Sequence, residues 1–304
     1  MFVVAAPGQG SQKAGFLKPW LESPDNRTLL ESWSALLDID LVAHGTTSDQ
    51  DTITDTAIAQ PLIVAAGIMT GRALLTALPE EVPLAFAGHS VGEFTAAALS
   101  GVLRDEDALT LVALRGKAMA RAAAATPTGM SAVLGAEEGA LEDALSRAGL
   151  FAANFNGGGQ VVIAGELTAL ASFQESPPPG MRAIPLQVAG AFHTSFMESA
   201  VSTLAEAAQG ITAHEPLYPL YTNRDGTRVS HEDALPYLVD QVARPVRWDL
   251  CMESFARDGI HGMMELAPAG ALVGLAKRTL KGVPNVALNT PDDTAAALEL
   301  VNAS

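Results

Sequence analysis

A single serine lies between two glycines in FAGHSVGEF, residues 86–94. The apolar run before it, 83–87, predicts a short buried strand, and residues 91–100 predict a helix with Glu93 in its first turn. Strand, G-x-S-x-G and helix is the order of a nucleophile elbow, in which the glycines make room for a sharp bend that exposes the hydroxyl. Ser90 is therefore a candidate nucleophile. A serine that only caps the helix after a glycine turn is the structural alternative.

A serine hydroxyl needs a neighbouring base to accept its proton, and the chain has six histidines. His193, in VAGAFHTSFMESA, follows an apolar strand and precedes a predicted helix, whose N-terminus would keep the imidazole neutral. His89 is a weaker candidate because successive side chains in the bend point apart. The remaining histidines lie in polar stretches or beside a strand: His44, His214, His231 and His261. His193 is the preferred base, with structural packing as its alternative.

Arg115 interrupts an otherwise apolar stripe on the predicted helix 106–122. A buried guanidinium is costly unless an anion meets it. Arg115 can bind a substrate carboxylate through two parallel hydrogen bonds. A structural ion pair with a carboxylate of the protein, or a side chain that reaches solvent, is the alternative.

The glycine-rich segment APGQGSQKAG, 6–15, follows the first predicted strand, where phosphate-binding loops usually lie. It lacks Gly-Lys-Ser/Thr, and Lys13 stands where G-x-G-x-x-G requires its third glycine. The loop can instead direct a backbone N–H or the Gln9 amide at a developing oxyanion. A turn shaped only by its glycines is equally compatible with the loop.

Strand-like and helical runs alternate along the chain, which predicts an α/β fold with a parallel sheet and flanking helices. Between 129 and 189 the order is βαββαβ, typical of a ferredoxin-like unit. We expect a small domain at 128–189 inserted into a larger one formed by 1–127 and 190–304. The expected strands are 2–7, 84–88, 159–165, 183–190, 217–223 and 261–268.

Composition limits the class of protein. The 304-residue chain is 48% hydrophobic and 17% charged, which is enough apolar sequence for a substantial core. Its formal charge of −16 opposes nucleic acids and anionic membranes, so neither is an expected partner. The single cysteine, Cys251, excludes an intramolecular disulfide and suits a reducing cytoplasm.

Neither a signal peptide nor a membrane span is expected. The first residues, MFVVAAPG, are too short for a signal core. The most apolar segment, 58–69, is interrupted by Gln60 and Pro61, and we predict it to be too short to cross a bilayer. We therefore expect a cytoplasmic protein. We also expect a monomer.

Taken together, the motifs resemble those of the bacterial malonyl-CoA:acyl carrier protein transacylases and the related acyltransferase domains of polyketide synthases. The resemblance follows the family's order from end to end of the chain. The matching motifs are PGQGSQ (7–12), QPL (60–62), GHSVGE (88–93), RG (115–116), NFNGGGQVVIAG (154–165), GAFH (190–193), QVARPVRW (241–248) and ELAPAGALVGLAKR (265–278). One departure is Ala269, where the family usually has a second glycine.

The resemblance implies a hydrolase-like large domain with a ferredoxin-like insert and a ping-pong transfer of malonyl from malonyl-CoA to the phosphopantetheine thiol of acyl carrier protein. It implies Ser90 as nucleophile, His193 as general base and later acid, and Arg115 as ligand of the malonyl carboxylate. The backbone N–H groups of Gln9 and Val91 would form the oxyanion hole. No metal or redox cofactor is expected.

Three further positions are implied less directly. Gln241 matches the position that helps to orient the histidine, where an ordinary hydrolase has Asp or Glu. Asn156 matches a position that lines the substrate cleft. Phe192, before the histidine, resembles the malonyl-selecting version of the motif, since its ring would fill the space of a 2-methyl branch. Core packing is the alternative for Phe192.

Other functions stay open on the same motifs. A trans-acting polyketide acyltransferase would share them all, and a serine thioesterase or hydrolase would share the elbow, with Asp240 as the nearest acid for its histidine. A non-catalytic scaffold that binds acyl carriers is the third alternative. Because acidic carriers are repelled by a −16 chain, docking requires a local basic patch, for which Lys277, Arg278 and Lys281 are candidates.

Overall fold

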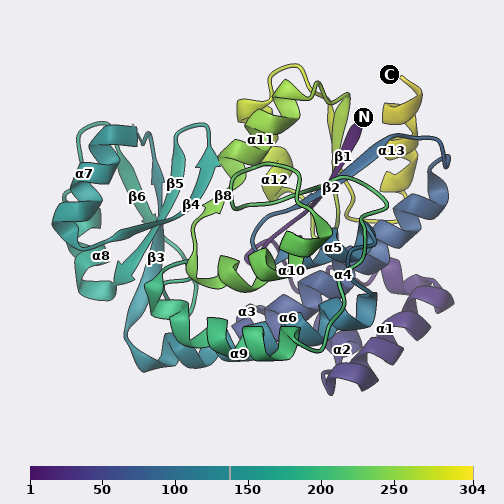
Figure 1. Ribbon diagram of the computed structural model, residues 1–304, viewed down its shortest axis with the longest axis horizontal. Helices are drawn as coiled ribbons and strands as arrows, with labels where there is room; N and C mark the ends of the chain where they lie inside the picture. Colours follow the sequence, from purple (N-terminus) through teal and green to yellow (C-terminus); the bar gives the residue numbers. More distant parts are fainter. Residues whose placement is uncertain (137, 304) are drawn as a thin grey trace.

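The computed structural model describes residues 1–136 and 138–303. It contains a five-stranded sheet in the spatial order β10-β9-β1-β2-β7, in which every neighbouring pair is parallel (Figure 1). The strands are β1 (Phe2–Ala6), β2 (Leu84–Gly88), β7 (Leu220–Tyr221), β9 (Gly262–Glu265) and β10 (Asn285–Ala287). The predicted α/β class with a parallel sheet is confirmed.

The residues of β1 and β2 are all buried, as expected of central parallel strands with helices on both faces. Alternate side chains along these strands point into two different hydrophobic cores. Val4, Ala6 and Phe86 pack against one set of helices, and Val3 and Ala5 pack against another. The first set is α1 (Pro24–Leu37), α4 (Thr56–Ala77), α5 (Gly92–Leu99), α6 (Asp105–Ala125) and α13 (Asp293–Asn302). The second is α11 (Trp248–Arg257) and α12 (Ala271–Thr279).

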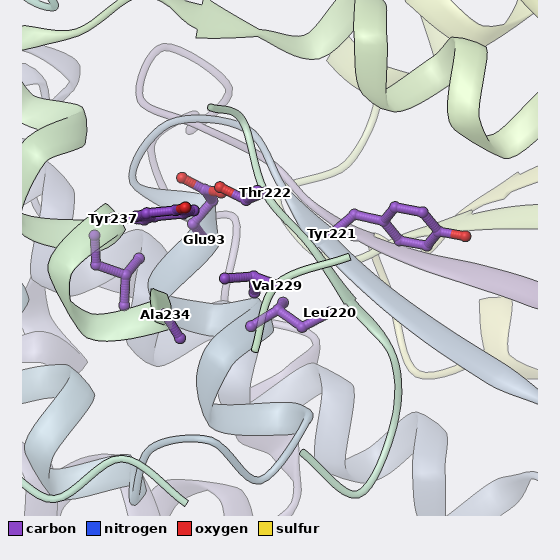
Figure 2. A pocket seen from close by; sticks show the side chains of 8 residues that line it. Glu93, Leu220, Tyr221, Thr222, Val229, Ala234 and Tyr237 are labelled. Carbon is purple, nitrogen blue, oxygen red and sulfur yellow. The ribbon is translucent and has the colours of Figure 1, made fainter. Parts of the chain in front are cut away.

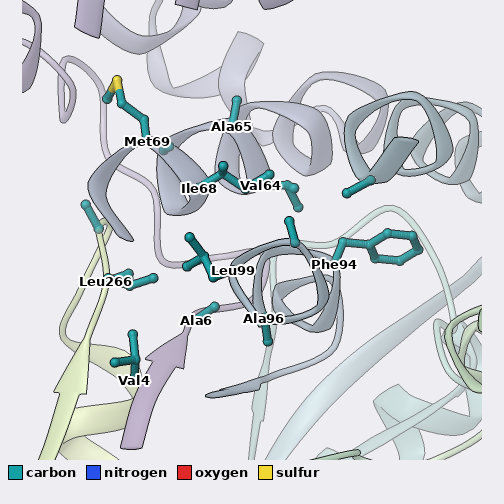
Figure 3. Packing of buried hydrophobic residues seen from close by; sticks show 14 of the residues in the cluster. Val4, Ala6, Val64, Ala65, Ile68, Met69, Phe94, Ala96, Leu99 and Leu266 are labelled. Atoms are coloured by element: carbon teal, nitrogen blue, oxygen red, sulfur yellow. The ribbon is translucent and has the colours of Figure 1, made fainter. Parts of the chain in front are cut away.

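Helix α4 corrects one expectation. It runs unbroken through Pro61 for 22 residues, so it is long and apolar enough to cross a membrane, contrary to the prediction from 58–69. Pro61 is the sixth residue of the helix, so its missing N–H costs one backbone hydrogen bond, and the buried residues on both sides of it keep the helix continuous. Of its most apolar 18-residue window, 78% is buried within the protein. Figure 3 shows Ile68 and Met69 of α4 among Val4 of β1 and Leu99 of α5, as in a core helix.

The second sheet has the spatial order β6-β3-β5-β4-β8. Its strands are β3 (Thr128–Leu134), β4 (Phe151–Gly157), β5 (Gln160–Glu166), β6 (Arg182–Pro185) and β8 (Val246–Arg247). The first four, with α7 (Glu138–Ala148) and α8 (Leu167–Glu175), follow the predicted βαββαβ order and pair antiparallel as 4-1-3-2. They lie together at the left of Figure 1. The domain boundaries stay a prediction, because β8 joins this sheet from outside 128–189.

Three expected strands are markedly shorter than predicted, and one of them, 261–268, is reduced to Gly262–Glu265. The strand at 183–190 ends at Pro185, and residues 186–188 line a cleft instead. The strand at 217–223 is reduced to Leu220–Tyr221, because Leu217 is 80% exposed and lies outside the sheet. Short helices complete the connections: η1 (Trp20–Glu22), α2 (Leu41–Thr46), α3 (Gln50–Thr54), η2 (Ser195–Met197), α9 (Glu198–Ala208), α10 (His231–Asp240) and η3 (Gln241–Ala243).

Candidate active site

Ser90 lies in the bend between β2 and α5, as the elbow pattern predicts. Its φ of +53° is in the left-handed region, which is costly for a residue other than glycine. A Cβ on Gly88 would lie 2.0 Å from the carbonyl carbon of Gly92, and one on Gly92 would lie 2.2 Å from the Ala6 oxygen. Both glycines are therefore required by close backbone contacts. The capping alternative is wrong, since the N-cap of α5 is Val91 and no side chain caps the helix.

Asn223 fixes the strained bend from the next strand along the sheet. Its Oδ1 accepts a hydrogen bond from the Ser90 N–H at 2.7 Å, and its Nδ2 donates to the Gly88 oxygen at 2.7 Å. The side chain is fully buried two residues after β7. Sequence reasoning missed Asn223. The available signal was a polar residue at the carboxyl end of a predicted parallel strand, next to the elbow strand.

His193 and Ser90 are 103 residues apart in the sequence, and the fold brings the Ser90 Oγ to 2.7 Å from the His193 Nε2. The His193 Nδ1 lies 2.8 Å from the backbone oxygen of Gln241. Because a carbonyl only accepts, Nδ1 carries the proton and Nε2 is left as an acceptor for the serine proton. The pair has the geometry of an activated nucleophile and its base.

Burial lowers the pKa of His193 to about 3, and the positive charge of Arg115 is the next cause, while the hydrogen bond to Gln241 acts in the opposite direction. The prediction that His193 is neutral is supported, but its physical reason differs from the expected one. The helix that follows, η2, has three residues and is capped by Thr194, so desolvation rather than a helix N-terminus disfavours the charged imidazole.

Arg115 is completely buried on α6. Its Nη1 donates to the Gln60 Oε1 at 2.7 Å and its Nη2 to the Gln241 Oε1 at 2.8 Å, while its buried Nε–H has no partner in the described chain. None of the ion pairs among residues 1–136 and 138–303 includes Arg115, which argues against a structural ion pair. Burial lowers the pKa of Arg115 to about 9, so the guanidinium stays charged at neutral pH.

These groups open into one cleft of about 620 Å³ between the two sheets. Seven of the eight site residues predicted from the sequence line it: Gln9, Ser90, Val91, Arg115, Asn156, Phe192 and His193. The exception is Gln241, whose side chain lies behind the cleft and lines a separate pocket of about 360 Å³. The cleft thus holds a nucleophile, a base and a buried cation with free donors.

The Gln9 loop offers backbone donors rather than its side chain. The Gln9 Nε2 already donates to the Thr56 Oγ1 at 3.2 Å. The backbone N–H groups of Gln9 and Val91 donate to no acceptor within the described residues, although both residues line the cleft. Free N–H groups beside the nucleophile suit an oxyanion hole. Of the two options left open by the sequence, the backbone N–H of Gln9 is the better supported.

Gln241 contributes through two different groups. Its backbone oxygen holds the His193 ring, whereas its side chain bonds to Arg115 and donates to the Ser90 oxygen at 2.9 Å. The orientation of the histidine therefore depends on the main chain at 241 and not on the glutamine side chain. Asp240, the acid that a hydrolase would use, forms an ion pair with Arg224 at 3.5 Å instead.

Asn156 and Phe192 both lie at the cleft. The Asn156 Oδ1 is 2.9 Å from the His89 Nε2, so His89 is held away from Ser90 by this contact. Phe192 is 5% exposed and packs in a core cluster with Met119 and Met130 while it also lines the cleft. Both interpretations of Phe192, core packing and cleft wall, are compatible with this position.

The candidate docking residues Lys277, Arg278 and Lys281 are exposed at the end of α12, and Arg278 also lines the cleft. No group of three or more His, Cys, Asp or Glu side chains able to hold a metal ion occurs in the part of the chain that the structure describes.

We expect NMR titration of the imidazole protons to give a pKa for His193 far below the usual 6.5, because the buried ring loses its hydration when charged. A His193→Gln variant assigns the resonance. Arg115→Met removes the second cause, so in that variant the pKa should rise but stay below 6.5. A wild-type pKa near 6.5 would contradict the desolvation argument.

Comparison with known proteins gives one consistent answer. Residues 1–295 match the acyl transferase domain family. The chain is 46% identical to the malonyl CoA-acyl carrier protein transacylase of Mycobacterium tuberculosis H37Rv over 96% of this chain and 98% of the relative. It is 33% identical to that of Escherichia coli K12, over 98% and 99%.

Solved structures agree. The crystal structure of MCAT from M. tuberculosis has a TM-score of 0.95 at 45% identity, over 98% of this chain and 99% of that one. A malonyl-transacylase in complex with its type II polyketide synthase acyl-carrier protein has a TM-score of 0.93 at 31% identity, over 98% and 99%. The chain therefore belongs to the acyl transferase family, among the malonyl CoA-acyl carrier protein transacylases.

Proposed function

We propose that this protein transfers a malonyl group from malonyl-CoA to the phosphopantetheine thiol of an acyl carrier protein through a malonyl-serine intermediate. One observation carries the proposal: a buried guanidinium with an unpartnered N–H lies in the same cleft as a serine–histidine pair. The relatives named above as malonyl CoA-acyl carrier protein transacylases support it, as does the solved complex of one transacylase with its carrier.

The first half-reaction acylates the enzyme. The Ser90 Oγ attacks the thioester carbonyl while the His193 Nε2 takes its proton, and the backbone N–H groups of Gln9 and Val91 stabilise the tetrahedral oxyanion. When the intermediate collapses, the C–S bond breaks and the sulfur of CoA leaves with the proton from His193. The product is a malonyl ester on Ser90 and free CoA.

The second half-reaction reverses these roles. The carrier's thiol gives its proton to His193 and attacks the serine ester. The C–O bond to Ser90 then breaks, and Ser90 recovers the proton. Because the pKa of His193 is lowered to about 3, the ring is neutral and ready to accept a proton over the whole physiological range. Acylation should therefore show no histidine titration near pH 6.5.

Arg115 provides the site for the malonyl carboxylate. A guanidinium has five N–H donors, of which Gln60 and Gln241 take two. The remaining donors can form a bidentate pair with a carboxylate, which would give this buried cation a direct ion pair. A neutral ester or thioester offers no such compensation. The arginine therefore favours malonyl transfer over a thioesterase or hydrolase function.

The position of His193 also disfavours an ordinary hydrolase. Its Nδ1 bonds to a carbonyl, while the nearest predicted acid, Asp240, pairs with Arg224. An intact Ser90–His193 pair likewise disfavours a scaffold without catalysis. The proposed pathway is fatty acid synthesis, and a polyketide carrier is the alternative. The proposed setting is the cytoplasm, with the protein as a monomer.

The proposed docking surface for the carrier is the patch of Lys277, Arg278 and Lys281 at the cleft. In a chain of net charge −16, an acidic carrier needs a local positive field to approach. Arg278 lines the cleft itself, so a carrier bound there would have its phosphopantetheine arm near the opening.

Brief exposure to malonyl-CoA should add one malonyl group to the wild-type protein, and Ser90→Ala should abolish the adduct because it removes the elbow hydroxyl. Mass spectrometry of the intact protein measures both, and peptide mapping locates the ester. A second serine that lines the cleft, Ser11 in the Gln9 loop, gives the matched control, so Ser11→Ala should keep the adduct. Undiminished adduct on another residue of Ser90→Ala would refute the proposed intermediate.

Arg115→Ala should reduce malonyl transfer by about 10²–10⁴-fold, the loss of two charge-assisted hydrogen bonds, while acetyl transfer is spared or improved. Arg115→Lys should also be poor, since a point charge does not reproduce the fork. Rates with malonyl-CoA and acetyl-CoA, measured side by side, give the ratio. Equal losses for both acyl groups would assign the arginine a structural role.

Phe192→Ser should admit methylmalonyl-CoA and narrow the preference for malonyl without abolishing activity. Exclusion of one methyl group by shape is worth about 10–200-fold in specificity, which sets the largest change to expect. Competition between the two thioesters on wild type and variant measures the ratio. If a folded and active variant keeps the wild-type ratio, selection against the branch lies elsewhere in the cleft and Phe192 is a packing residue.

A further inference from the structure

Glu93 is a buried carboxylate to which the mechanism above gives no role. It lies in the first turn of α5, three residues after Ser90, and is 5% exposed. Its Oε1 accepts a hydrogen bond from the Asn223 N–H at 2.7 Å, and its Oε2 accepts one from the Gln241 Nε2. No ion pair in the described chain includes it. A carboxylate buried at this cost, so close to a reactive centre, points to a role in the site.

The Gln241 side-chain amide has a donor end, its nitrogen, and an acceptor end, its oxygen. Each end faces partners that can form a hydrogen bond only with that end. The nitrogen donates to Glu93 and to the Ser90 oxygen, whereas the oxygen accepts from Arg115. An ionised carboxylate only accepts, and a guanidinium only donates. Glu93 and the Ser90 carbonyl oxygen together set which way the amide points, and the amide in turn presents its oxygen to the guanidinium.

We propose that Glu93 is a positioning residue for substrate selection: its carboxylate fixes the Gln241 side chain, which holds the Arg115 guanidinium in place for the malonyl carboxylate. This inference rests on the proposed function. It assigns no contact with substrate to Glu93, which acts through Gln241. It also explains why the side chain at 241 is an amide, since a side chain without both a donor and an acceptor cannot join a carboxylate to a guanidinium.

The electrostatics support this arrangement. The negative charge of Glu93 favours the charged form of Arg115 against the cost of burial, yet the carboxylate makes no contact that would occupy the guanidinium. A direct ion pair would compete with the substrate carboxylate. Gln241 separates the two charges by one amide, so the site keeps the compensating charge and leaves donors of Arg115 free.

The surroundings of Glu93 leave it little room to move. Figure 2 shows the side chain beside Thr222 and Tyr237, around a cavity of about 10 Å³ that holds at most one water. Because of burial, the pKa of Glu93 is raised to about 7. The charged and titratable groups around it, from α6, α10, α11 and the loops that line the neighbouring 360 Å³ pocket, are Arg115, Tyr237, Asp240, Cys251, Arg224, Arg244 and Arg247.

The test is Glu93→Gln, which keeps the volume and the acceptor for Asn223. Its new amide N–H₂ would face the Gln241 nitrogen, so Gln241 either loses an acceptor and shifts or turns its own N–H₂ towards Arg115, and both changes displace the oxygen that holds the guanidinium. We expect malonyl acylation, measured as kcat/KM, to fall by about 10–100-fold, mainly through KM, while acetyl acylation stays within about threefold of wild type. Glu206→Gln, an exposed position on α9, is the matched control and should change neither rate.

A double-mutant cycle with Gln241→Met tests the route. Methionine has a similar volume and no amide, so this variant should show the same loss of malonyl preference, and adding Glu93→Gln to it should cost little more. If Glu93→Gln is equally harmful in the Gln241→Met background, Glu93 does not act through Gln241 and the inference fails. It also fails if Glu93→Gln lowers malonyl and acetyl acylation equally or leaves their ratio unchanged.

The same series separates this inference from the proposed function. Wild-type protein that forms no malonyl adduct overturns the function itself. If the wild type forms the adduct and the Glu93→Gln variant has the wild-type ratio of malonyl to acetyl acylation, only the role of Glu93 is overturned. The thermal unfolding temperature of each variant shows whether the variant is folded, so that a lower rate is not caused by unfolding. The wild-type malonyl-to-acetyl ratio should also rise with pH through about 7, as Glu93 ionises, and should not do so in Glu93→Gln.

Discussion

The positive charge of Arg115, buried without a direct ion pair in the described chain, is the constraint around which the site is organised. Three elements meet to hold it: α4 supplies the Gln60 oxygen, η3 supplies the Gln241 oxygen, and α5 supplies the nearby charge of Glu93. Amide oxygens partly replace lost hydration without cancelling the charge. The cleft therefore contains a cation whose remaining donors are best satisfied by an anion from outside the protein, and in the proposed mechanism this anion is the substrate carboxylate.

The reactive pair depends on a second constraint, the close approach of β1, β2 and α5. Because Gly88 and Gly92 lack a Cβ, the backbone can turn so sharply that Ser90 takes a left-handed conformation. Asn223 holds that conformation by accepting from the Ser90 N–H. The same backbone that exposes the hydroxyl also leaves the Val91 N–H without an acceptor among residues 1–136 and 138–303. Strain at the nucleophile and a free oxyanion donor thus have one structural cause.

Features that lie within one short stretch of sequence were predicted, whereas features that depend on contacts between distant segments were missed. The elbow at Ser90, the apolar stripe broken by Arg115 and the βαββαβ order were visible because each lies within one short stretch. Asn223 was missed, and Glu93 was seen only as a residue of the elbow motif, because the role of each depends on a bond to a segment more than 100 residues away. The side chain of Gln241 was assigned to the histidine, whereas the main-chain oxygen does that work. Pro61 was taken as a break in a helix that continues through it, because the tertiary packing of the buried residues around it outweighs the one lost backbone hydrogen bond.

The choice of a carbonyl rather than a carboxylate behind His193 follows from the neighbouring guanidinium. A carboxylate at Nδ1 would stabilise the imidazolium, but it would also add a second negative charge, besides Glu93, near the groups that hold Arg115, and this would weaken the attraction of the site for the malonyl carboxylate. The Gln241 oxygen fixes the tautomer without that charge, and the pKa of His193 stays low, in part because of Arg115 itself. When a malonyl carboxylate binds to Arg115 as proposed, its charge offsets this second cause, so the imidazole becomes a better base. The acyl group that fits the arginine thereby strengthens the base that activates Ser90, and an acetyl group, which has no carboxylate, does not.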